Sequence, residues 1–285
     1  MCGFFCVFYY FLFVLCFFFY FYIDIYFSLC HTGRNRQFVF TYYTGDVFMF
    51  LSDIHTHSIA SGHGTSCTIS DMAKEASLQG LKLLGITDHG PATLAAGTPS
   101  YFRSLLYSPK KRFGVELLYG IELNILDISG KVDLEQELLD QMDYAIASMH
   151  YQNFRPRSCE ENTQAFLNAM ENPVVKILGH CDNTQYPVDY EAIIKKAGET
   201  STILEINEAS LAPYGYRGDT RDNCSQILHY CHKYLVPIVL SSDSHGKEHI
   251  GDFTYSAEFV HNAMFPEALI LNNQIPKLKM LLQIR

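Results

Sequence analysis

Seven short apolar segments, each bounded by turn residues and followed by a stretch with helical spacing, limit most strongly how this chain can fold. They occupy residues 50–54, 81–87, 116–124, 144–149, 175–179, 202–207 and 236–241. Most are continuous apolar runs, which is typical of strands covered on both faces. Repeated strand–helix units predict an α/β fold with a parallel sheet. Seven units within residues 49–285 favour a closed or nearly closed (β/α)7 barrel over two small domains.

Capping residues support this division into strands and helices. Ser70 is expected to cap a helix that begins at Asp71 and stops at Gly80. Asp189 is expected to cap a second helix that stops at Gly198.

Residues 1–48 form a hydrophobic N-terminal extension that differs sharply from the remainder. They hold 13 of the 21 Phe and carry no net charge, so the whole net charge of −9 belongs to residues 49–285. Residues 1–23 contain no charged side chain and, as a helix, are long enough to cross a bilayer. The first basic residue is Arg34, which argues against a secretory signal. Two alternatives stay open: a membrane anchor, or a misassigned start with the true start at Met49.

The remaining composition restricts the functional class and the compartment. The acidic balance argues against a nucleic-acid partner, which would require a basic face. The nine cysteines include no C-x-x-C pair, so a disulfide framework or a zinc ribbon is not indicated. We therefore expect residues 49–285 to lie in the cytoplasm, with a membrane association only if residues 1–23 are an anchor.

Nine histidine and acidic side chains lie at or just beyond the carboxyl ends of the expected strands. They are His55, His57, His63, His89, Glu122, His150, His180, Asp243 and His245. In a parallel barrel these ends meet at one face, where active sites are built. Seven imidazoles and two carboxylates suit Zn²⁺, with Mn²⁺ or Fe²⁺ as alternatives, and nine ligands exceed what one tetrahedral ion can use. The pattern therefore predicts a cluster of several metal ions. The other histidines (His31, His229, His232, His249 and His261) are expected to be ordinary packed or surface residues.

The motifs around these ligands resemble the PHP (polymerase and histidinol phosphatase) superfamily, and most closely its YcdX-like phosphatase branch. They are Asp53-Ile-His-Thr-His-Ser, Ile86-Thr-Asp-His-Gly-Pro, Gly120-Ile-Glu-Leu-Asn-Ile, Asn162-Thr-Gln-Ala, Leu204-Glu-Ile-Asn and Ser242-Asp-Ser-His. The resemblance covers essentially residues 50–285 and implies a distorted seven-stranded (β/α)7 barrel. Cys181 stands where the branch usually has proline, and the loops after strands four and six differ from those of relatives.

The resemblance also implies three zinc ions. The first ion would be held by His55, His57, Glu122 and Asp243, the second by His63, His89 and His245, and the third by His150, His180 and Glu122. Glu122 would thus bridge two ions, and Glu122 and Asp243 are the acidic groups we expect to be catalytic. Three divalent ions would outweigh these two carboxylates, so the pocket would be positive and suited to a small phosphorylated substrate. Such ions activate water for attack on phosphorus, which predicts a phosphoric ester hydrolase of the phosphomonoesterase type.

Further residues near this face are candidates for supporting roles. Arg155, Arg157, Arg217 and Arg221 are candidates for binding substrate phosphate, and the alternative for each is a solvated loop charge. Asp53 and Asp88 could orient ligand imidazoles or simply stabilise turns. The alternative functions are a histidinol-phosphate phosphatase or a PHP-type nuclease and, less favoured, a non-catalytic metal-binding protein.

Overall fold

The computed structural model describes residues 49–284, and the expectations about residues 1–48 fall outside them. Eleven strands are formed by these residues: β1 (Ser52–Asp53), β2 (Thr56–His57), β3 (Leu83–Ile86), β4 (Lys111–Arg112), β5 (Val115–Tyr119), β6 (Ile121–Asn124), β7 (Ala145–Ser148), β8 (Val175–Leu178), β9 (Ile203–Asn207), β10 (Ile238–Ser241) and β11 (Ser244–His245). No helix within residues 49–284 has the length and apolar character needed to span a membrane.

The strands form three sheets, which are mostly parallel, as the sequence predicts. One sheet has the order β1-β3-β5-β4, a second has the order β10-β9-β8-β7-β6, and β11 pairs with β2. Only the short β4 is antiparallel to its neighbour β5. The expected strand over residues 116–124 is divided at Gly120 into β5 and β6, which belong to different sheets. A side chain at position 120 would meet the Tyr144 carbonyl oxygen at 2.9 Å, so this junction requires glycine.

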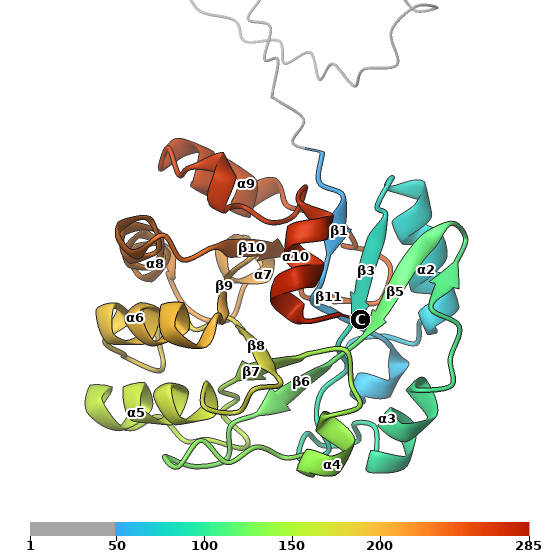
Figure 1. The fold of residues 1–285 in the computed structure, drawn as a ribbon, viewed down its shortest axis with the longest axis horizontal. Helices are drawn as coiled ribbons and strands as arrows, with labels where there is room; N and C mark the ends of the chain where they lie inside the picture. The colour runs from blue at the N-terminus through green and yellow to red at the C-terminus, as the bar shows by residue number, and fades with distance from the viewer. Residues whose placement is uncertain (1–48, 285) are drawn as a thin grey trace, which may run out of the picture. The chain divides into compact units, whose positions relative to one another are not determined.

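Helices cover the outer faces of the sheets. They are α2 (Ile69–Leu78), α3 (Pro99–Leu105), α4 (Gln136–Leu139), α5 (Cys159–Ala169), α6 (Tyr190–Thr200), α7 (Glu208–Leu211), α8 (Arg221–Tyr234), α9 (Thr254–Asn262) and α10 (Ile275–Leu282), with 3₁₀ turns η1 (Ile59–Ser61) and η2 (Glu267–Leu269). Figure 1 shows α5, α6 and α8 in a row along the five-stranded sheet, and α2 and α3 beside the four-stranded sheet. This arrangement explains why the strands read as continuous apolar runs.

Two of the expected helix boundaries are wrong and two are confirmed. Helix α2 ends at Leu78 and Gly80 follows its cap with a φ of 82°, as the expected stop at Gly80 requires. Helix α2 is capped by Thr68, because Thr68 and Asp71 exchange the reciprocal hydrogen bonds of a capping box, whereas Ser70 lies inside the first turn. Asp189 caps α6 as expected. That helix continues past Gly198 to Thr200, where Ser201 adopts the left-handed conformation.

Residues from both large sheets form a separate apolar cluster. Its buried members are Ile54, Leu83, Leu118, Tyr144, Ile146, Ile177, Ile203, Val239, Leu271, Leu278 and Leu282. Strands of both large sheets contribute to it, and α10 supplies its last two members. The hydrogen-bond ladders nevertheless trace three sheets, so the closed barrel stays a prediction.

Candidate metal centre

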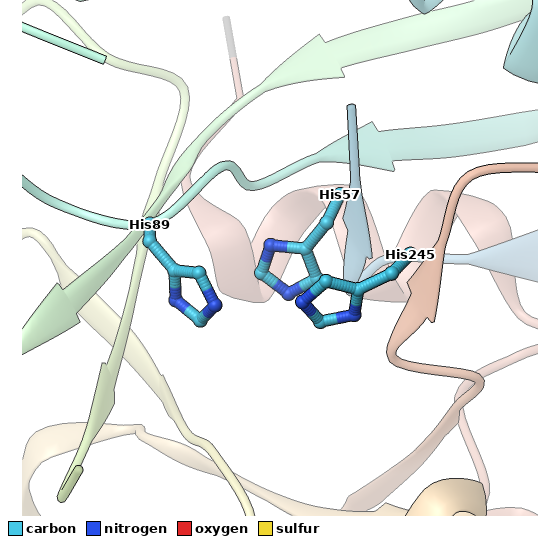
Figure 2. Close-up of side chains that lie close together, drawn as sticks. All are labelled: His57, His89 and His245. Atoms are coloured by element: carbon cyan, nitrogen blue, oxygen red, sulfur yellow. The ribbon is translucent and has the colours of Figure 1, made fainter. Parts of the chain in front are cut away.

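The nine side chains selected from the sequence lie close together in the structure. Three groups have ligand atoms within 4.8 Å of one another: His57, His89 and His245; His55, His57 and Asp243; and His89, Glu122 and His150. Figure 2 shows the first of these groups, in which the three imidazoles come from separate segments of the chain. His180 places its Nε2 atom 2.9 Å from Glu122 Oε1. The His63 ring lies 4.9 Å from the His245 ring and 5.0 Å from the His89 ring, measured between centroids.

Glu122 lies at the centre of this group, fully buried in β6. Its Oε1 atom faces three Nε2 atoms: His180 at 2.9 Å, His150 at 3.3 Å and His55 at 3.5 Å. Its Oε2 atom faces two other imidazoles: His89 Nδ1 at 2.6 Å and His57 Nε2 at 3.6 Å. The two oxygens of one carboxylate therefore face different sets of nitrogens, as a bridging ligand would.

The two carboxylate oxygens of Asp243 also contact different groups. Oδ1 lies 3.2 Å from His57 Nε2 and 3.8 Å from His55 Nε2. Oδ2 accepts hydrogen bonds from Arg217 Nη2 at 2.7 Å and from Asn207 Nδ2 at 3.2 Å. Asp243 also has a positive φ of 54°, a conformation uncommon outside glycine. The loop after β10 is thus held so that one oxygen is anchored and the other faces the histidines.

Hydrogen bonds at Nδ1 define the tautomer of five histidines. The acceptors are Glu205 Oε1 for His55 (2.6 Å), Ser61 Oγ for His57 (2.9 Å), the Ser61 carbonyl for His63 (3.2 Å), Asn124 Oδ1 for His150 (2.7 Å) and the Asp243 carbonyl for His245 (3.1 Å). Because each partner accepts, we assign the hydrogen to Nδ1 and the lone pair to Nε2. Five imidazoles thus present a free Nε2 lone pair, the form that binds a metal.

Several buried polar atoms at this centre have no hydrogen-bond partner. They are His55 Nε2, His57 Nε2, His245 Nε2, His89 Nδ1 and Glu122 Oε2. The last two are 2.6 Å apart, but they are not aligned as a hydrogen bond. Leaving buried polar atoms unpaired is costly, and native proteins rarely do so. Five such atoms, all nitrogen or carboxylate oxygen and all in one place, fit a site for divalent metal ions such as zinc.

At His57 and Glu122 the electrostatics favour the protonation states that metal binding requires, whereas at His55 burial is outweighed by the surrounding carboxylates, which raise the pKa. Burial, together with the neighbouring His245 and His89, lowers the pKa of His57 well below its usual value. Burial alone would raise the pKa of Glu122, but His150, His89 and His55 hold it well below its usual range. At neutral pH His57 is therefore neutral and Glu122 is ionised.

The four arginines selected from the sequence have different surroundings. Arg217 is buried and paired with Asp243. The other three are exposed and have partners of their own: Arg155 lies over the Tyr151 ring, Arg157 is 3.4 Å from Glu161, and Arg221 is 3.2 Å from Asp219. A role in substrate binding stays a prediction for all four. The Arg217 guanidinium additionally holds a candidate metal ligand in place.

The two aspartates considered as supporting residues have distinct contacts. Asp88 accepts a hydrogen bond from Ser61 Oγ at 2.7 Å, and Ser61 in turn contacts His57, so Asp88 reaches an imidazole through a serine. Asp53 accepts from the backbone nitrogens of Ser242 and Gly251 and so ties down the chain after β10. Burial raises the pKa of Asp53 to about 6.

Three residues that hold the histidines carry no role predicted from the sequence: Glu205, Ser61 and Asn124. The sequence does contain a signal for Glu205. It places a charged residue within the apolar strand β9, and a buried charge requires a partner. Asn124 lies in the motif Gly120-Ile-Glu-Leu-Asn-Ile, but the motif alone gives it no role, and nothing in the spacing marks Ser61, a common loop residue.

Known proteins are similar to this chain in sequence and in fold. Residues 53–209 match the model of the PHP domain family. A probable phosphatase of Clostridium botulinum (strain Hall) is 40% identical over 229 residues, which cover 80% of this chain and 93% of the relative. A probable phosphatase of Clostridium acetobutylicum is 38% identical with the same coverage. A solved histidinol phosphate phosphatase of Lactococcus lactis, complexed with zinc, L-histidinol and phosphate, has a TM-score of 0.54 at 19% identity, covering 76% of this chain and 95% of its own.

Proposed function

Because the chain belongs to the PHP domain family and is a phosphatase, we propose that it hydrolyses small phosphomonoesters with a cluster of metal ions held by the nine side chains described above. The proposed metal is zinc and the proposed number of ions is three. His55, His57, Glu122 and Asp243 would hold the first, His63, His89 and His245 the second, and His150, His180 and Glu122 the third.

The geometry of Glu122 is the observation that carries this proposal. Its oxygens face two separate sets of imidazole nitrogens, and Oε2 is among the five buried atoms that lack a hydrogen-bond partner. A histidine-rich core without metal would be expected to pair these atoms with one another or with water. The gathering of unpaired ligand atoms around the two Glu122 oxygens supports a bridging role for this carboxylate.

Divalent ions bound there would supply an activated water at neutral pH and neutralise charge on the attacking and leaving oxygens of the phosphoryl group. The chain itself supplies the orientation of the ligands. Glu205 holds the His55 ring, Asn124 holds the His150 ring, and Arg217 fixes Asp243. These contacts restrict each ligand to one tautomer and one direction, which is how neighbouring groups tune a metal site.

We also propose that the two large sheets are arcs of one distorted seven-stranded barrel. Gly120 joins the arcs at one side, where β5 passes into β6. At the other side the Asn272 side chain donates to the carbonyl oxygens of Ser52 and Leu240, and so connects β1 with β10. This closure would bring the carboxyl ends of all seven strands to one face.

The 19% identity to the Lactococcus lactis enzyme supports a common fold and does not extend to its substrate. No contact in the described residues favours a nuclease.

Hydrolysis of 4-nitrophenyl phosphate tests the proposal. The purified protein should lose activity after dialysis against a chelator and regain it with zinc or manganese. Glu122→Gln should reduce both the bound metal and the activity by orders of magnitude, because it removes a charge shared by two ions. Glu191→Gln, which affects a surface ion pair with Lys233, is the matched control. Wild-type activity and metal content in Glu122→Gln would overturn the proposed cluster.

A further inference from the structure

Ser61 occupies an unusual place beside the candidate metal centre. It is the last residue of η1, the 3₁₀ turn that follows β2, and it is fully buried. The next residue, Gly62, has a φ of 82° and turns the chain away. Ser61 is therefore held between the strand that carries His57 and the loop that carries His63.

Three of the nine candidate ligands are contacted by this one serine. Its Oγ atom lies 2.9 Å from His57 Nδ1 and accepts a hydrogen bond from the His89 backbone nitrogen at 3.2 Å. Its carbonyl oxygen lies 3.2 Å from His63 Nδ1. His57 and His89 face Oε2 of Glu122 and belong to the group with His245. The His63 ring lies beside the rings of His89 and His245.

The direction of the serine hydroxyl is fixed by Asp88. The Asp88 carboxylate can only accept when it is ionised, so the Ser61 hydroxyl donates to it across 2.7 Å. The Ser61 lone pairs must then accept from His57 and His89. Asp88 is held in turn by Ser58, through both its backbone nitrogen and its hydroxyl, and by the Tyr101 hydroxyl from α3.

We propose that Ser61 is a positioning residue that sets the Nδ1–H tautomer of His57 and His63 and fixes the backbone at His89. Through these three ligands it controls the affinity for metal on the Oε2 side of Glu122, and Asp88 and Tyr101 hold it in the required orientation. The inference rests on the proposed metal cluster and adds that one part of the cluster depends on a single serine, through its hydroxyl at His57 and His89 and its carbonyl at His63.

Zinc-loaded Ser61→Ala should release part of its metal more readily than the wild-type protein. Loss of a residue that orients metal ligands typically lowers metal affinity about 10- to 100-fold. Titration with a zinc chelator, followed by elemental analysis, measures this change ion by ion. We expect weaker binding of the two zinc ions proposed at His57 and at His89 and unchanged binding of the third, with a lower kcat for 4-nitrophenyl phosphate and a smaller change in KM.

Ser241→Ala is the matched control. Ser241 is also fully buried, and its hydroxyl has no hydrogen-bond partner, so this change removes the same atom without removing a hydrogen bond. Its zinc affinity should equal that of the wild-type protein. Long-range ¹H–¹⁵N spectra of the zinc-loaded proteins give a second measurement: the Nδ1–H signal of His57, which bonds to the Ser61 hydroxyl, should change in Ser61→Ala and not in Ser241→Ala. The His63 signal serves as an internal reference, because the Ser61 carbonyl that accepts from it is kept in alanine.

Tyr101→Phe keeps the inference testable if Ser61→Ala does not fold. It removes one donor to Asp88 and touches none of the nine candidate ligands, so a smaller loss of zinc affinity is expected. Unchanged zinc affinity and unchanged histidine signals in the variant that folds would overturn the role of Ser61. A wild-type protein that binds no zinc would instead overturn the proposed cluster, and the two failures are therefore distinguishable.

Discussion

A substitution at Glu205 tests whether hydrogen bonds at Nδ1 fix the tautomer and orientation of the candidate metal ligands. Glu205 is buried in β9, and its carboxylate accepts three hydrogen bonds: from His55 Nδ1 at 2.6 Å, from the His180 backbone nitrogen at 2.6 Å and from Asn207 Nδ2 at 3.1 Å. Burial alone would raise its pKa, but His55 beside it keeps the pKa below its usual value. Glu205→Gln preserves the shape of this side chain and replaces one acceptor oxygen with a donor.

The glutamine has no orientation that satisfies all of its neighbours. If the amide nitrogen faces His55, that ring must move its hydrogen to Nε2, and the lone pair intended for metal is lost. If the amide nitrogen instead faces His180 and Asn207, this new donor meets two groups that are themselves donors, the His180 backbone nitrogen and Asn207 Nδ2. A hydrogen bond to a charged group contributes about 1.5–3 kcal/mol. At 1.4 kcal/mol for each factor of ten, the metal affinity should fall about 10- to 150-fold.

Competition with a zinc chelator, monitored together with phosphatase activity, is the appropriate assay. Glu116→Gln is a control of the same chemistry, because Glu116 pairs with Lys279 at the surface, away from the nine candidate ligands. Glu116→Gln should bind zinc like the wild-type protein. Wild-type zinc affinity in Glu205→Gln would refute the reasoning that the hydrogen bond from His55 Nδ1 to Glu205 fixes the tautomer in which Nε2 can bind metal.

The remaining predictions concern the surroundings of the same centre. Arg217→Met should lower the free energy of unfolding by about 3–5 kcal/mol, because it leaves Asp243 buried without its charge partner, and urea denaturation measures this loss. Gly64→Ala should reduce activity, since a Cβ at its φ of 79° would lie 2.8 Å from the His245 side chain. Gly80→Ala has a similar φ but open space around it, so it should cost only about 1–2 kcal/mol of stability and no activity. Metal removal should lower the thermal midpoint, and zinc should restore it, because a ligand that binds only the folded state stabilises that state; an unchanged midpoint would count against a metal bound at this centre.

The placement of the candidate ligands could be predicted because it depends on local pattern. Continuous apolar runs identify parallel strands, and side chains at their carboxyl ends meet at one face. His55, Glu122 and Asp243 are far apart in the sequence. Each lies at or just after the carboxyl end of a predicted parallel strand, so the predicted fold brings them to one face. The structure confirms the parallel α/β fold and groups these residues within a few ångströms.

Other features depend on tertiary contacts that no local pattern encodes. The division of residues 116–124 into two strands follows from the close approach of Tyr144 to Gly120. The hydrogen-bond acceptors of His57 and His150 are a loop serine and a strand-end asparagine, residue types that are frequent throughout the chain. The pairing of Arg217 with Asp243 depends on how the loop before α8 folds back over β9, and spacing does not predict this.

Anomalous scattering would test the proposed cluster most directly. Crystals of the zinc-loaded protein, measured on both sides of the zinc absorption edge, should show peaks among the nine side chains at about 2.0–2.2 Å from imidazole nitrogens and carboxylate oxygens. We predict three peaks, with one Glu122 carboxylate shared between two of them. A map with no peak at Glu122, or with zinc bound only elsewhere on the protein, would contradict the proposed centre.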